Sequence, residues 1–274
     1  MIDQAEKARR FRALHERDGA FVIPNPWDAG SAKILAAMGF EALATTSAGF
    51  AYSLGRLDGQ VTRDEKLAHA AALCAATDLP VSADMENCFA DAPEGVAGTI
   101  RLAAASGLVG CSIEDYTDKP AAKIYDFDLA VARVKAGVEA ARGMVFPFTI
   151  TARAEGVLRG LCDLDEAIRR LKAFEEAGAD VLYAPGLTTL DQVRAVTSAV
   201  SKPVNVLATA DFTVDGLSEA GAKRISLGSW NYVTAMSGLI EAGKQMKNEG
   251  SFAALGQGVR SRDIAQMMKT GGAS

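Results

Sequence analysis

The sequence predicts an α/β fold, a (β/α)8 TIM barrel, on three observations. Short apolar runs alternate with amphipathic stretches along almost the whole chain. There are eight such runs, and eight strands that are each followed by a helix occupy about 250 residues, which is the usual size of this barrel. The competing open, doubly wound sheet more often has a GxGxxG turn after its first strand, whereas the first apolar run here is followed by PNPWDAG.

Each predicted strand is a short, mostly apolar run that begins or ends near a turn residue. Runs of this length are typical of buried strands, because helices usually need about 10 residues or more. In chain order the predicted strands are FVIP (21–24), ALATT (42–46), VSADM (81–85), GCSIE (110–114), FPFTITAR (146–153), DVLYA (180–184), PVNVL (203–207) and RISLG (224–228).

The stretches between the strands have helical patterns with ordinary start and stop signals. The charged N-terminus, residues 1–18, adds an extra helix, and one or two helices follow Gly250. We therefore predict a single barrel domain over residues 1–274, with 250–274 as a C-terminal helical tail. The helix signals are Asp28 to Met38 before Gly39, starts after Thr62, Asp91 and Asp126, and Asp163 to Ala177 before Gly178.

Composition excludes several classes of protein. The net charge of −5 argues against a nucleic-acid binder, which usually has a basic face. The N-terminus lacks the apolar core of a signal peptide, and no apolar run approaches the roughly 18 residues of a membrane span. The four cysteines form no CxxC pair, which suits a reducing compartment. These features predict a cytoplasmic protein without nucleic-acid or membrane partners.

Acidic side chains gather where predicted strands end. Asp84 and Glu86 are two positions apart, so in an extended chain they point to the same side. Glu114 ends the next strand, and Arg153 ends the one after that. Chemistry in this barrel sits at the C-terminal strand ends. Three converging carboxylates with no nearby lysine would repel one another, and oxygen ligands of this kind suit Mg²⁺. The plainer alternative is that these acids only accept hydrogen bonds from loop amides.

Other catalytic groups fit less well. A Schiff-base lysine belongs near the C-terminal rim, but Lys202 and Lys223 precede the last two strands and so lie at the opposite end. Cys88 and Cys111 have no histidine within reach, since His15 and His69 both fall in helical segments. For Cys111 we expect ordinary packing as a small hydrophobic residue.

Four segments together resemble the isocitrate lyase/phosphoenolpyruvate mutase superfamily: ATTSAGFAYSLGRLD, VSADME, SIEDYTDK and ITARAE. The resemblance extends from PNPWDAGSAKIL to LGSWNYVTAM, nearly the whole chain. It implies a barrel whose last helix is often swapped between subunits, assembled as a homodimer or homotetramer. It also implies Mg²⁺, with Mn²⁺ as a substitute, and a 2-oxo acid or related carboxylate as substrate. The shared chemistry makes or breaks a C–C or P–C bond beside a pyruvate-type enolate.

The resemblance also implies roles for single residues. Asp84 is similar to the direct metal ligand, Glu86 and Glu114 to the acids that hold metal-bound waters, and Asp58 to an acid near the metal shell.

Substrate contacts follow in the same way. Thr46, Ser47 and Ala48 lie where family members grip the substrate carboxylate, and Arg153 matches the arginine that binds substrate and stabilises negative charge. Asn205, on the seventh predicted strand, is a further candidate for substrate binding.

The chain departs from the isocitrate-type lyases at two places. They carry a KKCGH-type loop after strand four, where this chain has YTDKPAAKIYDF, and a glutamate after strand six, where it has YAPGL. Thr117, Asp118, Lys119 and Lys123 are the obvious functional groups of that shorter loop, which is a candidate lid. For protonation of the enolate, Tyr116, Lys119 and water all stay open.

These observations predict a Mg²⁺-dependent carbon–carbon lyase acting on a 2-oxo acid such as oxaloacetate, by decarboxylation or C–C cleavage through an enolate. One alternative is P–C chemistry on phosphonopyruvate, as a mutase or hydrolase. Another is a catalytically weak barrel that binds a metabolite without turnover.

Overall fold

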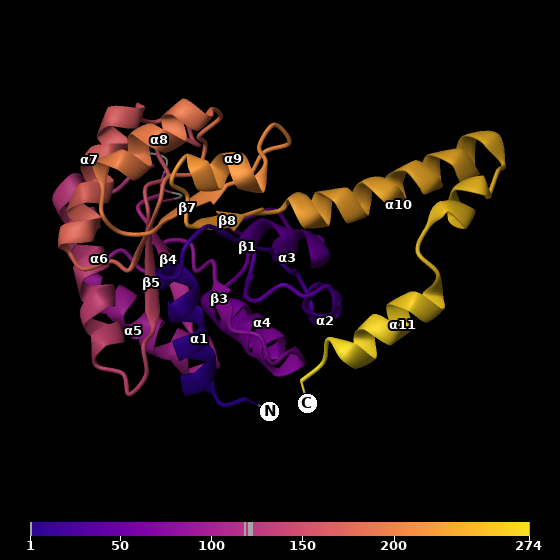
Figure 1. The fold of residues 1–274 in the computed structure, drawn as a ribbon, viewed down its shortest axis with the longest axis horizontal. Coiled ribbons are helices and arrows are strands. Elements are labelled where there is room, and N and C mark those ends of the chain that lie inside the picture. The colour runs from indigo at the N-terminus through magenta and orange to yellow at the C-terminus, as the bar shows by residue number, and fades with distance from the viewer. Residues whose placement is uncertain (1, 118, 120–122, 274) are drawn as a thin grey trace.

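The computed structural model describes residues 2–117, 119 and 123–273, and its eight-stranded parallel sheet confirms the predicted (β/α)8 barrel (Figure 1). The strand order is β1-β8-β7-β6-β5-β4-β3-β2, and the Ala44 amide donates a 3.1 Å hydrogen bond to the Pro24 carbonyl where β1 meets β2. The strands are β1 Phe21–Ile23, β2 Leu43–Ala44, β3 Val81–Ala83, β4 Gly110–Glu114, β5 Thr149–Arg153, β6 Val181–Tyr183, β7 Val204–Leu207 and β8 Arg224–Ser226.

Helices surround this sheet and connect its strands (Figure 1). Those of the described residues are α1 Gln4–Glu16, α2 Ala29–Ala37, α3 Ser47–Ser53, α4 Arg63–Ala76, α5 Pro93–Ala105, α6 Phe127–Arg142, α7 Leu164–Glu176, α8 Leu190–Ala199, α9 Val214–Glu219, α10 Trp230–Glu249, the 3-10 helix η1 Ala253–Gln257 and α11 Ser261–Thr270.

Most helix boundaries follow the local signals in the sequence. Asp28 and Ser31 form a reciprocal capping box at the start of α2, and Thr62 and Glu65 form another at the start of α4. Gly39 and Gly178, just beyond α2 and α7, have φ values of 90° and 95°, which glycine adopts without steric strain.

Seven of the eight strands are shorter than predicted, β2 and β5 most of all, and one helix is additional. β5 begins at Thr149 rather than at residue 146, because Pro147 has no N–H to donate to the ladder. β2 ends at Ala44, and the Thr46 hydroxyl instead accepts a hydrogen bond from the Gly49 amide. That cap starts α3, a helix that the sequence pattern did not predict.

Helix α1 closes the N-terminal end of the barrel. Its Phe11 is fully buried among residues that start or precede the strands, including Phe21 and Val109. The Lys223 ammonium donates to the carbonyls of Arg17 and Gly19 at this same end, as expected for a lysine that precedes β8. The predicted acidic residues lie at the opposite end, where the strands terminate.

The C-terminal segment leaves the barrel and returns to it. Helix α10 projects outward, and the chain then turns back through η1 so that α11 packs on α2 (Figure 1). The fit is close at Gly271, where a Cβ atom would lie 1.8 Å from the Lys33 carbonyl oxygen. No residue of α10 is buried. Exchange of this segment between subunits stays a prediction.

No helix among the described residues is long and apolar enough to cross a membrane. The four cysteines are all free thiols. Cys88 and Cys111 are buried, and burial raises the pKa of the Cys88 thiol to about 12 and that of Cys111 well above its ordinary value. Neither thiol is therefore suited to act as a nucleophile.

Substituting Gly110 by Ala tests how tightly β4 and β5 are packed. The added Cβ would lie 2.6 Å from the Thr149 carbonyl oxygen and 3.3 Å from Phe11. We expect Gly110→Ala to lower the free energy of unfolding by about 1–3 kcal/mol, measured by urea denaturation. The matched control is Gly98→Ala in α5, where nothing lies within 4 Å of the new Cβ; it should raise stability by roughly 0.5–1 kcal/mol. Equal effects of both substitutions would contradict this interpretation.

Candidate active site

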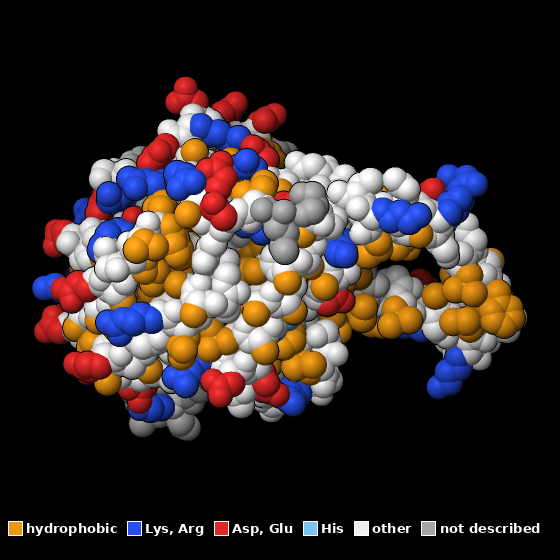
Figure 2. All heavy atoms as spheres, turned by 90° about the horizontal axis from the view of Figure 1, so that it is seen from below, with side chains coloured by type: hydrophobic (Ala, Val, Ile, Leu, Met, Phe, Trp, Pro, Cys, Tyr) orange, Lys and Arg blue, Asp and Glu red, His pale blue; other side chains and the backbone are white. Residues whose placement is uncertain are grey.

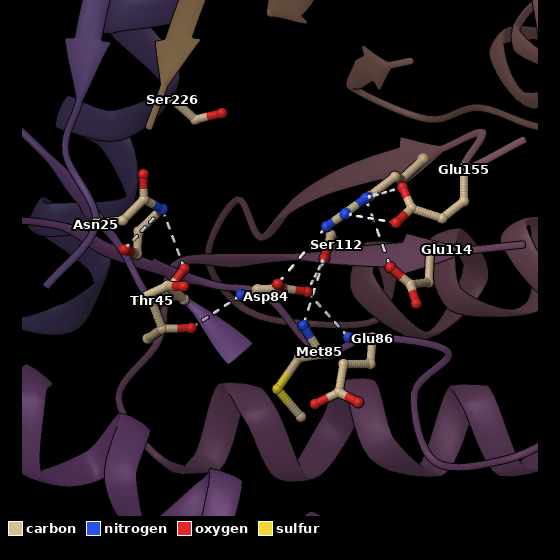
Figure 3. Close-up of polar contacts among 12 residues, drawn as sticks. Asn25, Thr45, Asp84, Met85, Glu86, Ser112, Glu114, Glu155 and Ser226 are labelled. Carbon is tan, nitrogen blue, oxygen red and sulfur yellow. Dashed lines mark hydrogen bonds and ion pairs between the residues drawn. The ribbon is translucent and has the colours of Figure 1, made fainter. Parts of the chain in front are cut away.

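The C-terminal strand ends bring the predicted acidic residues together (Figure 3). In the register of β4 and β5, Glu114 lies opposite Arg153, and Asp84 follows directly after β3. The resulting pocket has a volume of about 210 Å³. Its lining comprises Ser47, Asp58, Gly59, Glu86, Asn87, Glu114, Tyr116, Arg153 and Arg159.

Asp84 is fixed from both neighbouring strands. Its backbone amide donates to the Thr45 hydroxyl at 3.0 Å, and its Oδ1 accepts hydrogen bonds from the Glu86 amide at 3.1 Å and the Ser112 hydroxyl at 3.4 Å (Figure 3). Burial opposes ionisation of this carboxyl, but Arg153 and Lys66 outweigh it and lower its pKa below the ordinary value. Asp84 is therefore held as a carboxylate, the form that a metal ligand needs.

Glu86 lies beside a lysine that sequence reasoning missed. The Lys66 ammonium, on α4, is fully buried and is 3.3 Å from Glu86 Oε1. The expectation that no lysine lies near the acids was therefore wrong. Lys66 belongs to the buried face of α4 with Ala70 and Leu73, so a lysine in an apolar helical stripe was the available signal.

Even with this partner, the Glu86 carboxyl is reluctant to ionise. Burial raises its pKa to about 7, and the charges of Asp84 and Asp58 add to the increase, while Lys66 acts against it. Its Oε1 atom is buried and accepts no hydrogen bond from the described residues. Glu86 also has a positive φ of 52°, which is uncommon for a residue other than glycine.

Glu114 is the most deeply buried of the three predicted acids. Its Oε2 is 3.5 Å from the Arg153 Nε atom. Burial raises the pKa of Glu114 well above its ordinary value, and the neighbouring carboxylates of Glu155 and Asp84 raise it further, although Arg153 lowers it. The site therefore contains more buried acid than its own cations neutralise.

Arg153 is the central cation, and a second missed residue, Glu155, orients it. Glu155 is fully buried and accepts two hydrogen bonds from Arg153, at 2.7 Å to Nε and 2.8 Å to Nη2. The Nη1 atom is 3.6 Å from Asp84, and the guanidinium lies 5.1 Å from the centre of the Tyr183 ring. A planar guanidinium held bidentately keeps a fixed orientation toward the pocket. Glu155 lies next to a predicted strand end, but its inward direction needed the tertiary structure.

The remaining predicted residues take different positions. Thr46 caps α3, and Ser47 borders the pocket, where its hydroxyl is close enough to lower the pKa of Asp84. Ala48 follows in the first turn of α3. Asp58 is exposed at the edge of the pocket, near enough to affect Glu86.

Asn205 lies away from these groups, in the barrel interior. Its amide donates to the Ser226 hydroxyl at 2.9 Å, and its Oδ1 accepts from the Arg224 Nε at 2.9 Å. It borders a smaller cavity of about 60 Å³, which Asp84 and Arg153 also line. The amide nitrogen and the oxygen of the Asn205 side chain already have hydrogen-bond partners, so Asn205 is placed to support the site from the barrel interior. Asp118 of the candidate lid lies outside the described residues.

The chemistry of these side chains fits a hard divalent cation. The carboxylates of Asp84, Glu114 and Glu155 pair with Arg153, and that of Glu86 pairs with Lys66, so four carboxylates face two cations. Among the described residues, no group of three or more His, Cys, Asp or Glu forms a cage that could hold a metal ion. Mg²⁺ needs no such cage, because it keeps several waters and binds through one or two carboxylates.

Similarity to known proteins assigns the family of this chain. The phosphoenolpyruvate phosphomutase family matches residues 11–247, so the chain belongs to this family, within the superfamily that its motifs resemble. A provisionally assigned lyase/mutase of known structure from Burkholderia cenocepacia J2315 is 52% identical with a TM-score of 0.94, covering 96% of this chain and 95% of that one.

Two further relatives are more distant. An uncharacterised protein of Mycobacterium tuberculosis H37Rv is 33% identical over 87% of this chain and 89% of its own length. An oxaloacetate decarboxylase of Paraburkholderia xenovorans LB400 is 29% identical over 74% of this chain and 69% of its own length. These relationships confirm the predicted superfamily and support its carbon–carbon lyases as the enzyme class, with the reaction itself unspecified.

Substituting Lys66 by Met tests whether the buried ammonium stabilises the Glu86 carboxylate. Folding raises the pKa of Glu86 to about 7, so the folded protein binds this proton more tightly than the unfolded chain does. The stabilisation that results is present at low pH and is lost as the pH rises through about 7. At pH 8, Lys66→Met should leave an unpaired buried carboxylate and lower the free energy of unfolding by about 3 kcal/mol.

The loss should shrink at pH 5.5, where Glu86 is protonated in the folded protein. Urea denaturation at the two pH values measures both effects. The double variant Lys66→Met/Glu86→Gln is the control and should recover most of the loss at pH 8. A loss of equal size at both pH values would mean that Lys66 acts through packing or through Asp84, whose pKa it also lowers, and not through the Glu86 carboxylate.

Proposed function

We propose that this protein is a Mg²⁺-dependent lyase that cleaves the C–C bond of an oxaloacetate-like 2-oxo acid through a pyruvate-type enolate. The observation that supports it most is the convergence of Asp84 and Glu114 on Arg153 at three adjacent strand ends, with Glu86 lining the same pocket. An enolate carries negative charge on oxygen, and a pocket of this kind offers both a cation-binding edge and a fixed guanidinium. The oxaloacetate decarboxylase among the relatives is consistent with this substrate class.

Asp84 would bind the metal directly, and Glu86 and Glu114 would hold its water ligands. The family resemblance implies this division, and the directions of the pKa shifts agree with it, because the pKa of Asp84 is lowered while those of Glu86 and Glu114 are raised. Held by these residues, Mg²⁺ or Mn²⁺ would supply Lewis-acid chemistry at the substrate oxo group. Asp58, at the edge of the pocket, would add negative charge to the outer shell.

The carboxylate of the 2-oxo head would lie at the start of α3. The amides of Ser47 and Ala48 belong to the first helical turn, whose N–H groups have no intrahelical acceptors. The Thr46 hydroxyl already satisfies Gly49, which holds this turn in place. Asn205 would support the substrate site indirectly, because its hydrogen bond to Ser226 holds in place the strands that border the inner cavity.

Arg153 would hold the opposite side of the head and stabilise the developing charge. The surrounding carboxylates raise its pKa well above the ordinary value despite burial, so it stays protonated and cannot serve as the proton donor. Tyr116 lines the pocket, whereas Lys119 is ion-paired with the exposed Asp91. Tyr116 is therefore the better placed of these two residues to protonate the enolate, directly or through water.

The first test is pyruvate release from oxaloacetate, phosphonopyruvate, methylisocitrate and substituted malates, with and without Mg²⁺. We expect Mg²⁺-dependent release from oxaloacetate, reduced at least about 100-fold by Asp84→Asn, because one metal ligand is lost. Asp191→Asn, at an exposed carboxylate in α8, is the matched control and should leave the rate unchanged. Binding of Mn²⁺, followed by electron paramagnetic resonance, should weaken in Asp84→Asn alone.

Each other outcome identifies an alternative. Release from phosphonopyruvate alone would assign P–C chemistry, and release from methylisocitrate would show that this barrel cleaves it without the KKCGH loop. Tight Mg²⁺-dependent binding of oxalate without turnover of any of these acids would mark a metabolite-binding barrel.

The projecting helix α10 is proposed to mediate assembly with a second copy of the chain. Leu239, Ile240 and Phe252 are 63%, 55% and 67% exposed, high values for large apolar side chains. Figure 2 shows hydrophobic side chains on this projecting C-terminal part of the molecule. A homodimer or homotetramer would bury them, as the family resemblance implies.

Charged substitutions on α10 test this assembly. Leu239→Glu/Ile240→Glu should convert the oligomer to a monomer, because burying two carboxylates at an apolar contact is unfavourable. Lys244→Glu, at an exposed position of the same helix, is the control and should leave the mass unchanged. Size-exclusion chromatography with light scattering gives the mass. A wild-type monomer, or an oligomer that survives the double substitution, would contradict the proposal.

A further inference from the structure

The pocket contains a second arginine that the proposed roles leave unused. Arg159 lies in the turn after β5 and lines the same pocket as Arg153. Arg153 is committed to Glu155, Glu114 and Asp84, so few of its N–H groups are free for a second part of the substrate. Arg159 is the other arginine among the residues that line this pocket.

Contacts on two sides position the Arg159 guanidinium but do not saturate it. Its Nε lies 3.4 Å from Glu155 Oε1, and its central carbon lies 4.3 Å from the centre of the Tyr116 ring. The side chain is 39% exposed, and none of the described residues accepts a hydrogen bond from it. A guanidinium has five N–H donors in one plane, so stacking on Tyr116 leaves its edge available to a planar anion.

The charge of the rest of the pocket limits what can bind beside the metal-binding head. Asp58, Glu86 and Glu114 line the pocket, and each would repel a second anionic group in its ionised form. Arg159 offers the opposite charge. The pocket volume of about 210 Å³ is below the roughly 300 Å³ at which pockets for drug-sized ligands begin, so it suits a small acid.

We propose that Arg159 is a specificity-determining residue that binds a second anionic group on the third carbon of the substrate. The substrate class is then a 2-oxo acid with a carboxylate or phosphonate at that carbon, rather than a simple 2-oxo monocarboxylate. This inference rests on the proposed function, because the proposed head-binding groups orient the rest of the molecule toward Arg159. Glu155 forms ion pairs with both Arg153 and Arg159, so one carboxylate positions the arginines proposed to bind the head and the tail of the substrate.

Inert 2-hydroxy acids separate the contribution of the tail from that of the head. Malate and 2-hydroxy-3-phosphonopropanoate carry a carboxylate or phosphonate where 2-hydroxybutyrate has a methyl group, and oxalate provides a metal-binding head alone. With Mg²⁺ present, calorimetry should show the two acids with an anionic tail binding about 10- to 100-fold more tightly than 2-hydroxybutyrate, the range of one charge-assisted pair. The tighter of the two identifies the tail as carboxylate or phosphonate.

Arg159→Gln should abolish this preference and leave oxalate binding within about twofold of the wild type. Arg159→Lys should keep part of it, because the charge remains but the planar fork is lost. The matched control is Arg169→Gln. Arg169 also pairs with a glutamate, Glu166, and stacks 3.7 Å over a ring, that of Phe127, but it does not line this pocket.

The outcomes distinguish the inference from the proposed function. If the wild type binds oxalate and does not prefer the acids with an anionic tail, or if Arg159→Gln weakens oxalate and malate equally, the role of Arg159 is overturned and the head site stands. If the wild type fails to bind oxalate with Mg²⁺, the proposed function itself fails, and this inference fails with it.

Discussion

The bidentate ion pair between Glu155 and Arg153 is the interaction on which the rest of the site depends. A buried carboxylate that accepts two hydrogen bonds from a guanidinium fixes the position and the plane of that guanidinium. Asp84 and Glu114 can then approach the same cation from β3 and β4. Without a cation at this point, burial of these acids would force them to take up protons, and none would be available as a metal ligand.

The charges of the site are nevertheless unbalanced. The buried ammonium of Lys66 relieves Glu86 from one side, yet the pKa values of Glu86 and Glu114 stay raised. Excess buried negative charge lowers stability in the absence of a ligand, and a divalent cation would remove that excess. The destabilising charge is thus concentrated where binding can compensate for it, which is common at functional sites.

The two ends of the barrel have different roles, with packing at the N-terminal end and the candidate site at the C-terminal end. At the N-terminal end, α1 inserts Phe11 among apolar residues, and Lys223 binds backbone carbonyls. At the C-terminal end, the strands stop early and polar turns follow. β2 is the clearest case, because its two residues give way to the Thr46 cap and to α3, which adds Ser47 to the pocket lining.

Several elements were predictable because their signals are local. The apolar runs, the capping boxes at Asp28 and Thr62 and the glycines after α2 and α7 each act within a few residues. The position of Asp84, Glu114 and Arg153 at strand ends followed from the strand count, since parallel strands all end at one rim. Helix α3 was missed because its start depends on a single hydroxyl that the pattern also allows in a strand.

The sequence alone therefore determined the barrel, the family and the acids of its rim, because periodicity and strand ends are properties of the chain. Only the tertiary structure decided which charges meet. Lys66 faces Glu86 from a helix 20 residues away in sequence, and Glu155 turns inward to join Arg153 and Arg159. Electrostatic energies depend on distance and burial, and both are set when segments far apart in sequence pack together.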